Sequence, residues 1–301
     1  MLRSSASHSR QKTVIAHRGA SAYAPEHTLR SYELALQQGA DAVEQDLHVT
    51  KDGVLVCLHD LTLERTTNVQ NVFPKRGRDV LQGGRLTRHW FVRDFTVDEI
   101  QQLDAGSWFS AEFAGLRIPT FQEVIECVGS RGTHVTELKD PQVYEMLGVD
   151  LLSLFATTVR RNNLDQPRSG TASLTMQSFH EPTIRRAAAM FGGHLPRVLL
   201  IEPADADRWS DRDTMGALAD FASGIGPGKV MLEARPEIVR WAHEVGLRVT
   251  PWTFRATAPG RFGSVGAEMA YYLSVLDVDA VITDNPDQFP RESNEGVVRE
   301  R

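Results

Sequence analysis

The sequence predicts an α/β protein that folds as a TIM (β/α)8 barrel with a small insertion after the second strand. Three observations predict this fold: β-like runs alternate with helical patterns, eight β units can be counted, and one long segment interrupts the alternation. The chain has 301 residues, of which 41% are hydrophobic, so it can bury a core of this size. We therefore interpret residues 1–301 as one barrel domain.

The first two units lie in the first sixty residues. A β-rich run at Thr13–Gly19 precedes a helical stretch that stops near Gly39 and carries apolar residues on one face, namely Leu29, Tyr32 and Leu36. The second strand, Ala42–Thr50, alternates with a period of two. A Lys-Asp-Gly turn leads from it into a further run at Val54–Asp60, which predicts a β-hairpin.

Six later β-like runs complete the count of eight. They are His134–Lys139, Thr171–Ser178, Arg197–Ile201, Ser223–Gly226, Leu247–Trp252 and Ala280–Thr283. Helical patterns separate most of them, with a capping box at Thr120 and Glu123 and a helix start at Pro182. Repeated βα alternation favours a parallel sheet, and eight units favour a closed barrel over an open sheet.

Residues 61–118 interrupt this rhythm. They contain a glycine-rich and charged stretch, KRGRDVLQGGR, followed by six aromatic residues: Trp90, Phe91, Phe95, Trp108, Phe109 and Phe113. A segment of this length between barrel elements is usually functional or a small subdomain. We expect an insertion subdomain that is packed by its own aromatic residues and covers the mouth of the barrel.

Composition narrows the possible partners and compartments. The formal charge of -6 argues against a nucleic acid as partner, and no apolar run is long enough to predict a transmembrane segment. Residues 1–12 are polar and Ser-rich without the apolar core of a signal peptide, which predicts a cytoplasmic protein from the sequence as written. A leader removed beforehand would make it periplasmic or secreted.

Cys57 and Cys127 have no metal-ligand spacing, so we interpret them as free thiols. The oligomeric state stays open.

Polar residues at the carboxyl ends of barrel strands face the active-site mouth, which makes His17 and Arg18 candidates at the end of the first strand. Glu44 and Asp46 lie two residues apart on the second strand, so both carboxylates lie on one face. Their repulsion is unfavourable unless a cation or a proton lies between them. A cation site is therefore expected beside the first strand.

Three more residues extend this candidate site. Glu137, near the end of the third barrel strand, supplies a third carboxylate, and Lys139 shares its face, where a phosphate would bridge it to the metal. Three oxygen ligands without a thiolate suit one divalent hard cation, Ca²⁺ or Mg²⁺. His59 ends the hairpin and returns an imidazole to the carboxylates. Together, His17 and His59 would divide proton removal and proton delivery around a metal-bound phosphodiester.

The order of these residues resembles a known family. The matching motifs are His17-Arg18-Gly19, Pro25-Glu26-His27-Thr28, Gly39-Ala40-Asp41, Glu44-Gln45-Asp46, Thr50-Lys51-Asp52-Gly53 and His59-Asp60. Sparser matches follow at Glu137-Leu138-Lys139, Gln177-Ser178-Phe179, Gly224-Ile225-Gly226-Pro227, Trp252-Thr253 and Thr283-Asp284-Asn285-Pro286. This pattern is similar to that of the glycerophosphodiester phosphodiesterases and reaches nearly the whole chain.

The resemblance implies a TIM barrel that hydrolyses a small-molecule glycerophosphodiester to sn-glycerol 3-phosphate and an alcohol. It implies metal ligands at Glu44, Asp46 and Glu137, catalytic histidines at His17 and His59, and phosphate contacts at Arg18 and Lys139. The insertion would then select the alcohol. His27, where many relatives have Asn, is similar to the periplasmic bacterial branch and points to a calcium-using enzyme.

Several alternatives stay open. Trp252 ends a strand and either lines the mouth beside glycerol or packs in the core, while His48 is interpreted as a polar hairpin residue rather than a ligand. The nucleophile is either water or the glycerol 2-hydroxyl. Alternative functions are a lysophospholipase D or sphingomyelinase D-like phosphodiesterase, a barrel that binds glycerophosphodiesters without catalysis, and a two-carboxylate glycosidase, whose carboxylates lie about 5 Å or more apart across the substrate.

Overall fold

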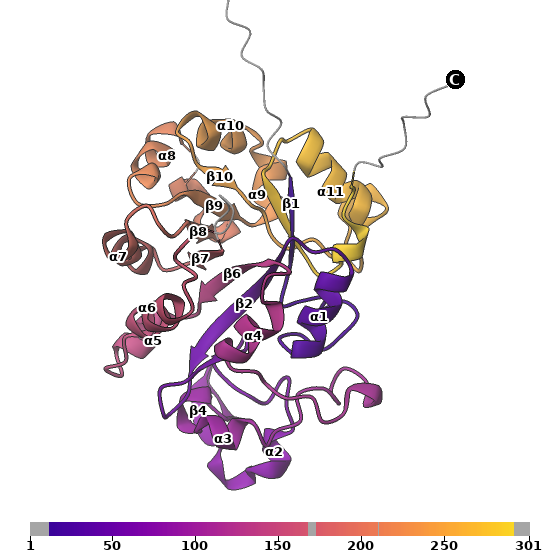
Figure 1. Cartoon of the computed structure of the whole chain (residues 1–301), viewed down its shortest axis with the longest axis vertical. Coiled ribbons are helices and arrows are strands. Elements are labelled where there is room, and N and C mark those ends of the chain that lie inside the picture. The colour runs from indigo at the N-terminus through magenta and orange to yellow at the C-terminus, as the bar shows by residue number, and fades with distance from the viewer. Residues whose placement is uncertain (1–11, 168–172, 210, 292–301) are drawn as a thin grey trace, which may run out of the picture.

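A computed structural model describes residues 12–167, 173–209 and 211–291, and it confirms the predicted barrel (Figure 1). The barrel strands are β1 (Thr13–Ala16), β2 (Ala42–Val49), β6 (Thr133–Leu138), β7 (Leu174–Ser178), β8 (Arg197–Ile201), β9 (Gly224–Pro227), β10 (Arg248–Val249) and β11 (Ala280–Thr283). Every pairing between them is parallel, in the order β10-β9-β8-β7-β6-β2-β1-β11. These eight strands are the eight that the sequence predicts.

Backbone hydrogen bonds close the barrel between its first and last strands in this order. The Asp279 N–H donates to the Val249 carbonyl (2.9 Å), and the Ile282 N–H donates to the Pro251 carbonyl (3.1 Å). Further along, the Phe254 N–H donates to the Ile282 carbonyl (2.9 Å). The segment after β10 therefore pairs with β11, which satisfies backbone groups that an open sheet would leave at its edges.

Several strands are shorter than the sequence predicts. β1 ends at Ala16 because Arg18 and Gly19 take positive φ angles of 56° and 86°, which turn the chain out of the sheet. β10 has only two residues, Arg248–Val249, although the predicted run reached Trp252. The predicted strand at Thr171–Ser178 begins at Leu174, and its first two positions lie outside the described residues, as does the polar segment 1–11.

Helices cover the outside of the barrel. They include α1 (Leu29–Gln37), α4 (Phe121–Val128), α5 (Pro141–Glu145), α6 (Leu151–Arg161), α7 (Glu181–Phe191), α8 (Arg212–Ala219), α9 (Lys229–Ala234), α10 (Glu237–Glu244) and α11 (Val265–Ser274). The predicted capping box is confirmed at the start of α4, where the Thr120 hydroxyl accepts from the Glu123 N–H and the Glu123 carboxylate accepts from the Thr120 N–H. Pro182 lies in the first turn of α7, also as predicted.

The segment after β2 forms a separate layer beside the barrel. β3 (Leu55–Cys57) pairs antiparallel with β2, which confirms the hairpin. α2 (Val69–Val72), the strands β4 (Arg78–Gln82) and β5 (Arg85–His89), and α3 (Val97–Ile100) follow. Trp90 and Phe95 are buried in a hydrophobic cluster of this layer, whereas Trp108 is 41% exposed and packs edge-on against Phe109. The predicted aromatic core therefore uses only part of the aromatic set.

Two other expectations concern single features. Cys57 is buried and Cys127 is half-buried, and both are free thiols, as predicted. None of the helices in the described ranges has the length and apolar character needed to cross a membrane.

Candidate active site

All eight residues selected from the sequence line one cavity of about 310 Å³ at the carboxyl ends of the barrel strands. They are His17, Arg18, Glu44, Asp46, His59, Glu137, Lys139 and Trp252. The barrel brings them together because the carboxyl ends of parallel strands meet at one rim. The remaining lining residues are Gln177, Phe179, Leu200, Glu202, Thr253, Arg255 and Ile282.

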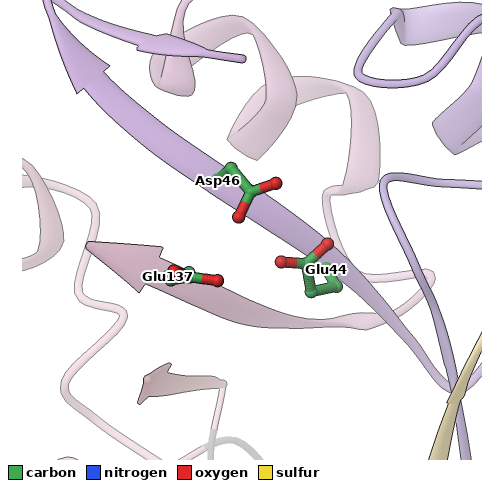
Figure 2. Close-up of side chains that lie close together, drawn as sticks. All are labelled: Glu44, Asp46 and Glu137. Atoms are coloured by element: carbon green, nitrogen blue, oxygen red, sulfur yellow. The ribbon is translucent and has the colours of Figure 1, made fainter. Parts of the chain in front are cut away.

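Three buried carboxylates form the floor of this cavity. Glu44 and Asp46 lie on β2 and Glu137 lies on the neighbouring β6 (Figure 2), where Asp46 and Glu137 are register partners. One oxygen atom from each carboxylate lies within 4.8 Å of the others. This convergence suits a single hard cation held by oxygen ligands, and it differs from the separated carboxylate pair of a glycosidase.

The proton affinities of the carboxylates fit a cation site. Burial and the neighbouring Asp46 raise the pKa of Glu137 to about 8 and that of Glu44 well above its ordinary value. Burial also opposes ionisation of Asp46, but Lys139, His27 and Arg18 outweigh it and hold the pKa of Asp46 well below its ordinary value. Without a cation, the cluster therefore retains protons at neutral pH, and a divalent ion would replace them.

Two cations lie beside the carboxylates. Lys139 Nζ is 3.1 Å from Glu137 Oε1 and 3.9 Å from Asp46 Oδ1, and these two carboxylates raise its pKa although burial lowers it. Arg18 Nε is 3.3 Å from Asp46 Oδ2, yet this buried nitrogen makes no hydrogen bond. Both cations line the same cavity, so an anion that enters it would meet positive charge beside the carboxylates.

The side chain of His17 is fixed by a residue from the other end of the chain. Its Nδ1 lies 2.6 Å from Asp284 Oδ1, and the second oxygen of Asp284 lies 2.9 Å from Arg255 Nε. Burial and the nearby Arg18 lower the pKa of His17 to about 4, against the opposing effect of Asp284. His17 is therefore neutral at physiological pH, with Nδ1 donating to Asp284 and Nε2 left as the basic nitrogen.

A second carboxylate holds His59. Its Nδ1 lies 2.6 Å from Asp60 Oδ1, and Arg65 donates to the other Asp60 oxygen. The Arg65 guanidinium also binds Glu26 through both terminal nitrogens, at 2.9 and 2.7 Å. Glu26 in turn accepts from Arg18 at 3.0 Å. A chain of alternating charges thus links Arg18 to His59 along one side of the cavity.

His48 lies in the β2–β3 hairpin opposite Val56, as predicted. His48 is fully buried, with Nδ1 2.9 Å from the Tyr144 hydroxyl and Nε2 3.1 Å from the His59 carbonyl. Its side chain therefore ties the backbone of His59 to β2 and α5. It lies one step further along β2 towards the turn than Asp46 and does not belong to the group of converging carboxylates.

Aromatic side chains form part of the cavity wall. Trp252 lines the cavity and also packs, half-buried, against the hydrophobic cluster that contains Ile15 and Ile282, and its Nε1 donates to the Gly226 carbonyl (2.7 Å). Phe179 packs edge-on against it, with ring centroids 5.6 Å apart. Gln177 reaches the floor and donates to Glu44 at 3.3 Å. This wall offers an apolar surface beside a charged floor.

His27 lies behind the carboxylates rather than in the cavity. It is buried, with Nε2 2.9 Å from Asp46 Oδ2 and Nδ1 2.7 Å from the Tyr32 hydroxyl. A residue in contact with Asp46 orients that carboxylate from behind. The sequence marked this position by its departure from Asn, but gave no sign of the contact with Asp46.

That the insertion covers the mouth stays a prediction. None of the described residues in 61–118 lines the cavity, and Arg65 provides the connection through Glu26 and Asp60. The other positioning residues were also missed. Asp60 and Asp284 belong to the matching motifs, beside His59 and after the last strand, and this membership is the signal that could have identified them. Arg65 and Arg255 belong to no motif.

Comparisons with known proteins agree with this geometry. Residues 17–288 match the model of the glycerophosphoryl diester phosphodiesterase family. The glycerophosphodiester phosphodiesterase of Bacillus subtilis (strain 168) is 30% identical over 91% of this chain and 84% of its own length. One from Caldanaerobacter subterraneus subsp. tengcongensis is 32% identical over 91% and 94%.

Solved structures give the same result. A glycerophosphodiester phosphodiesterase from Agrobacterium tumefaciens superposes with a TM-score of 0.66 at 27% identity, covering 93% of this chain and 99% of that one. An Oleispira antarctica phosphodiesterase, solved with the product sn-glycerol-3-phosphate, superposes with a TM-score of 0.71 at 25% identity, covering 92% and 94%.

Proposed function

The chain belongs to the glycerophosphoryl diester phosphodiesterase family and is a phosphoric diester hydrolase, and from this premise we propose that it converts glycerophosphodiesters to sn-glycerol 3-phosphate and a free alcohol. One observation carries the proposal: three converging carboxylates, two cations and two histidines line a single cavity. This arrangement supplies a place for a phosphate and a proton-transfer group for each side of it.

Glu44, Asp46 and Glu137 would hold one divalent cation, Ca²⁺ or Mg²⁺, and the fit rests on their convergence within 4.8 Å and on the proton affinity of Glu44 and Glu137. A bound cation supplies Lewis-acid stabilisation of the negative charge on the phosphate. Arg18 and Lys139, which line the same cavity, add to this by binding the non-bridging oxygens.

The two histidines take different roles in this proposal. His17 is kept neutral by burial and oriented through Nδ1 by Asp284, so its Nε2 removes the proton from the nucleophile. His59 is oriented through Nδ1 by Asp60, and it delivers the proton to the leaving alkoxide. The nucleophile is either water or the glycerol 2-hydroxyl, and the second route passes through a cyclic phosphate that is then hydrolysed.

The proposal is tested with glycerophosphocholine, glycerophosphoethanolamine, glycerophosphoglycerol and a lysophospholipid as substrates, with EDTA and with each metal added back. We expect metal-dependent release of sn-glycerol 3-phosphate from the first three. Preferred cleavage of the lysophospholipid would instead indicate a lysophospholipase D. Binding without turnover under every metal would indicate a glycerophosphodiester-binding barrel. Glu44→Gln and Asp46→Asn should fold and lose turnover, and full activity in either variant would refute the metal site.

A further inference from the structure

The hairpin of β4 and β5 presents two leucines to solvent. Leu81 and Leu86 face each other across the strands, and their exposed fractions are 69% and 68%. Gly83 and Gly84 form the tip with positive φ angles, as a tight hairpin turn requires. Neither leucine belongs to a hydrophobic cluster among the described residues. The two side chains therefore contribute nothing to the cores on either side of the hairpin.

The leucines lie on the outer face of the hairpin. The neighbouring pair, Val80 and Thr87, points to the opposite face and is half-buried. His89 on this inner face lies 2.6 Å from Glu64 through Nδ1, which attaches the hairpin to the rest of the insertion. A hairpin with one covered face normally places polar residues outward, and this tip does the reverse.

Basic residues lie on both faces of the hairpin: Arg88 shares the outer face with the leucines, and Arg78 and Arg85 lie on the face of Val80 and Thr87. Residues 75–89 contain five basic side chains and one acidic one, in a chain whose formal charge is -6. Lys75 and Arg85 are exposed and make no ion pair within the described ranges, while Arg78 and Arg88 keep 56% and 46% of their side chains exposed. The hairpin is therefore a local cationic patch with an apolar tip.

We propose that this hairpin docks the enzyme onto a lipid surface that contains anionic headgroups, with Leu81 and Leu86 inserted and the basic residues on the headgroups. Exposed leucine beside lysine and arginine is the combination that binds such interfaces. A stable protein partner would need about 800 Å² on each side, and a projecting two-residue tip offers far less. The proposal does not depend on the substrate of the active site.

The position of the hairpin would bring the active site near the lipid. Figure 1 places β4 beyond the carboxyl end of β2. The cavity is lined by residues at the carboxyl ends of the barrel strands, β2 among them. The insertion is held there by the Lys51 N–H, which donates to the Phe95 carbonyl (2.8 Å). No residue of the hairpin lines the cavity, so docking and turnover of a water-soluble substrate can be measured separately.

The test is co-sedimentation of the full chain with vesicles of phosphatidylcholine alone or mixed with phosphatidylglycerol. We expect binding to the mixed vesicles that weakens as salt is added. The double variant Leu81→Ser/Leu86→Ser should bind more than about tenfold more weakly, and Arg85→Gln about fivefold more weakly. Val275→Ser is the control, because Val275 is 64% exposed at the opposite end of the barrel, before β11.

Turnover of glycerophosphoglycerol by each variant checks that the fold is intact, and it should stay at the level of the unchanged chain. Three results would overturn the proposal. The first is no binding to the mixed vesicles, and the second is equal binding by the double variant. The third is a concentration-dependent dimer that the double variant abolishes, because the leucines would then be an interface between two copies. The proposal is supported if both hairpin variants lose vesicle binding but keep normal turnover, while the Val275→Ser control keeps both.

Discussion

Metal affinity should rise steeply with pH below about 8. Only the ionised form of a carboxyl binds a metal, and in the metal-free protein burial and the neighbouring Asp46 raise the pKa of Glu137 to about 8. The ion must therefore displace a proton at neutral pH. The same causes raise the pKa of Glu44 well above its ordinary value, so a second proton adds to the effect in the same direction.

The pKa of Glu137 sets the size of the change. With one proton in competition, the apparent dissociation constant is about twice its high-pH value at pH 8, about tenfold weaker at pH 7 and about 100-fold weaker at pH 6. A contribution from Glu44 makes the slope steeper than tenfold per pH unit. We therefore expect a loss of affinity of at least about 50-fold between pH 8 and pH 6.

Isothermal titration calorimetry with Ca²⁺ and Mg²⁺ at several pH values measures this dependence. Repeating the titration at pH 7 in two buffers with different ionisation enthalpies gives the number of protons released, which should lie between about one and two. Glu137→Gln is the matched variant, because it removes the titrating group and should bind more weakly with a shallower slope. A dissociation constant that is unchanged between pH 6 and pH 8, without proton release, would refute the reasoning.

Four further predictions concern residues around the site. His17→Ala and His59→Ala should each lower kcat about 100-fold or more with metal affinity unchanged, and a variant with near-normal kcat removes that histidine from the mechanism. Asp284→Asn should lower kcat at least about tenfold with KM unchanged, because the amide holds the His17 tautomer less well, and an unchanged pH profile and kcat would count against this role. Lys139→Ala should raise KM and lower kcat in steady-state kinetics, since the ammonium would bind the phosphate in both states, and a change in neither constant would exclude it from the phosphate site. Burial lowers the pKa of His48 to about 4, so the unfolded chain takes up a proton near pH 6.5 that the folded protein refuses. The folded protein therefore loses stability as pH falls from about 6.5 to 4. His48→Gln should make the melting temperature depend less on pH in that range, and an equal pH slope in both proteins would contradict this prediction.

Local residue patterns were sufficient to predict the barrel. Alternation with a period of two fixed β2, and an Asp-Gly turn fixed the β2–β3 hairpin that follows it. The capping box at Thr120 fixed the start of α4. These features depend on side-chain direction and on hydrogen bonds within a few residues, so neighbouring positions in the sequence carry all the information they need.

Residue spacing also predicted the centre of the site. Glu44 and Asp46 lie two apart and share a face of β2, and Glu137 lies on the strand that pairs with it, as their spacing and order predict. Lys139 follows Glu137 at the same spacing and lies 3.1 Å from it. A site built at the ends of adjacent parallel strands can be predicted because the strand order follows from the alternation of strands and helices.

Only the tertiary structure decided which groups hold the histidines and what the insertion touches. Asp284 lies 267 positions from His17 and reaches it because closure of the barrel places β11 beside β1. Arg65 reaches both Asp60 and Glu26, and no described residue of the insertion lines the cavity, because the segment packs on a hydrophobic cluster of its own. Such contacts form only when segments that are far apart in the sequence meet in the folded core. Residue spacing along the chain therefore does not predict them.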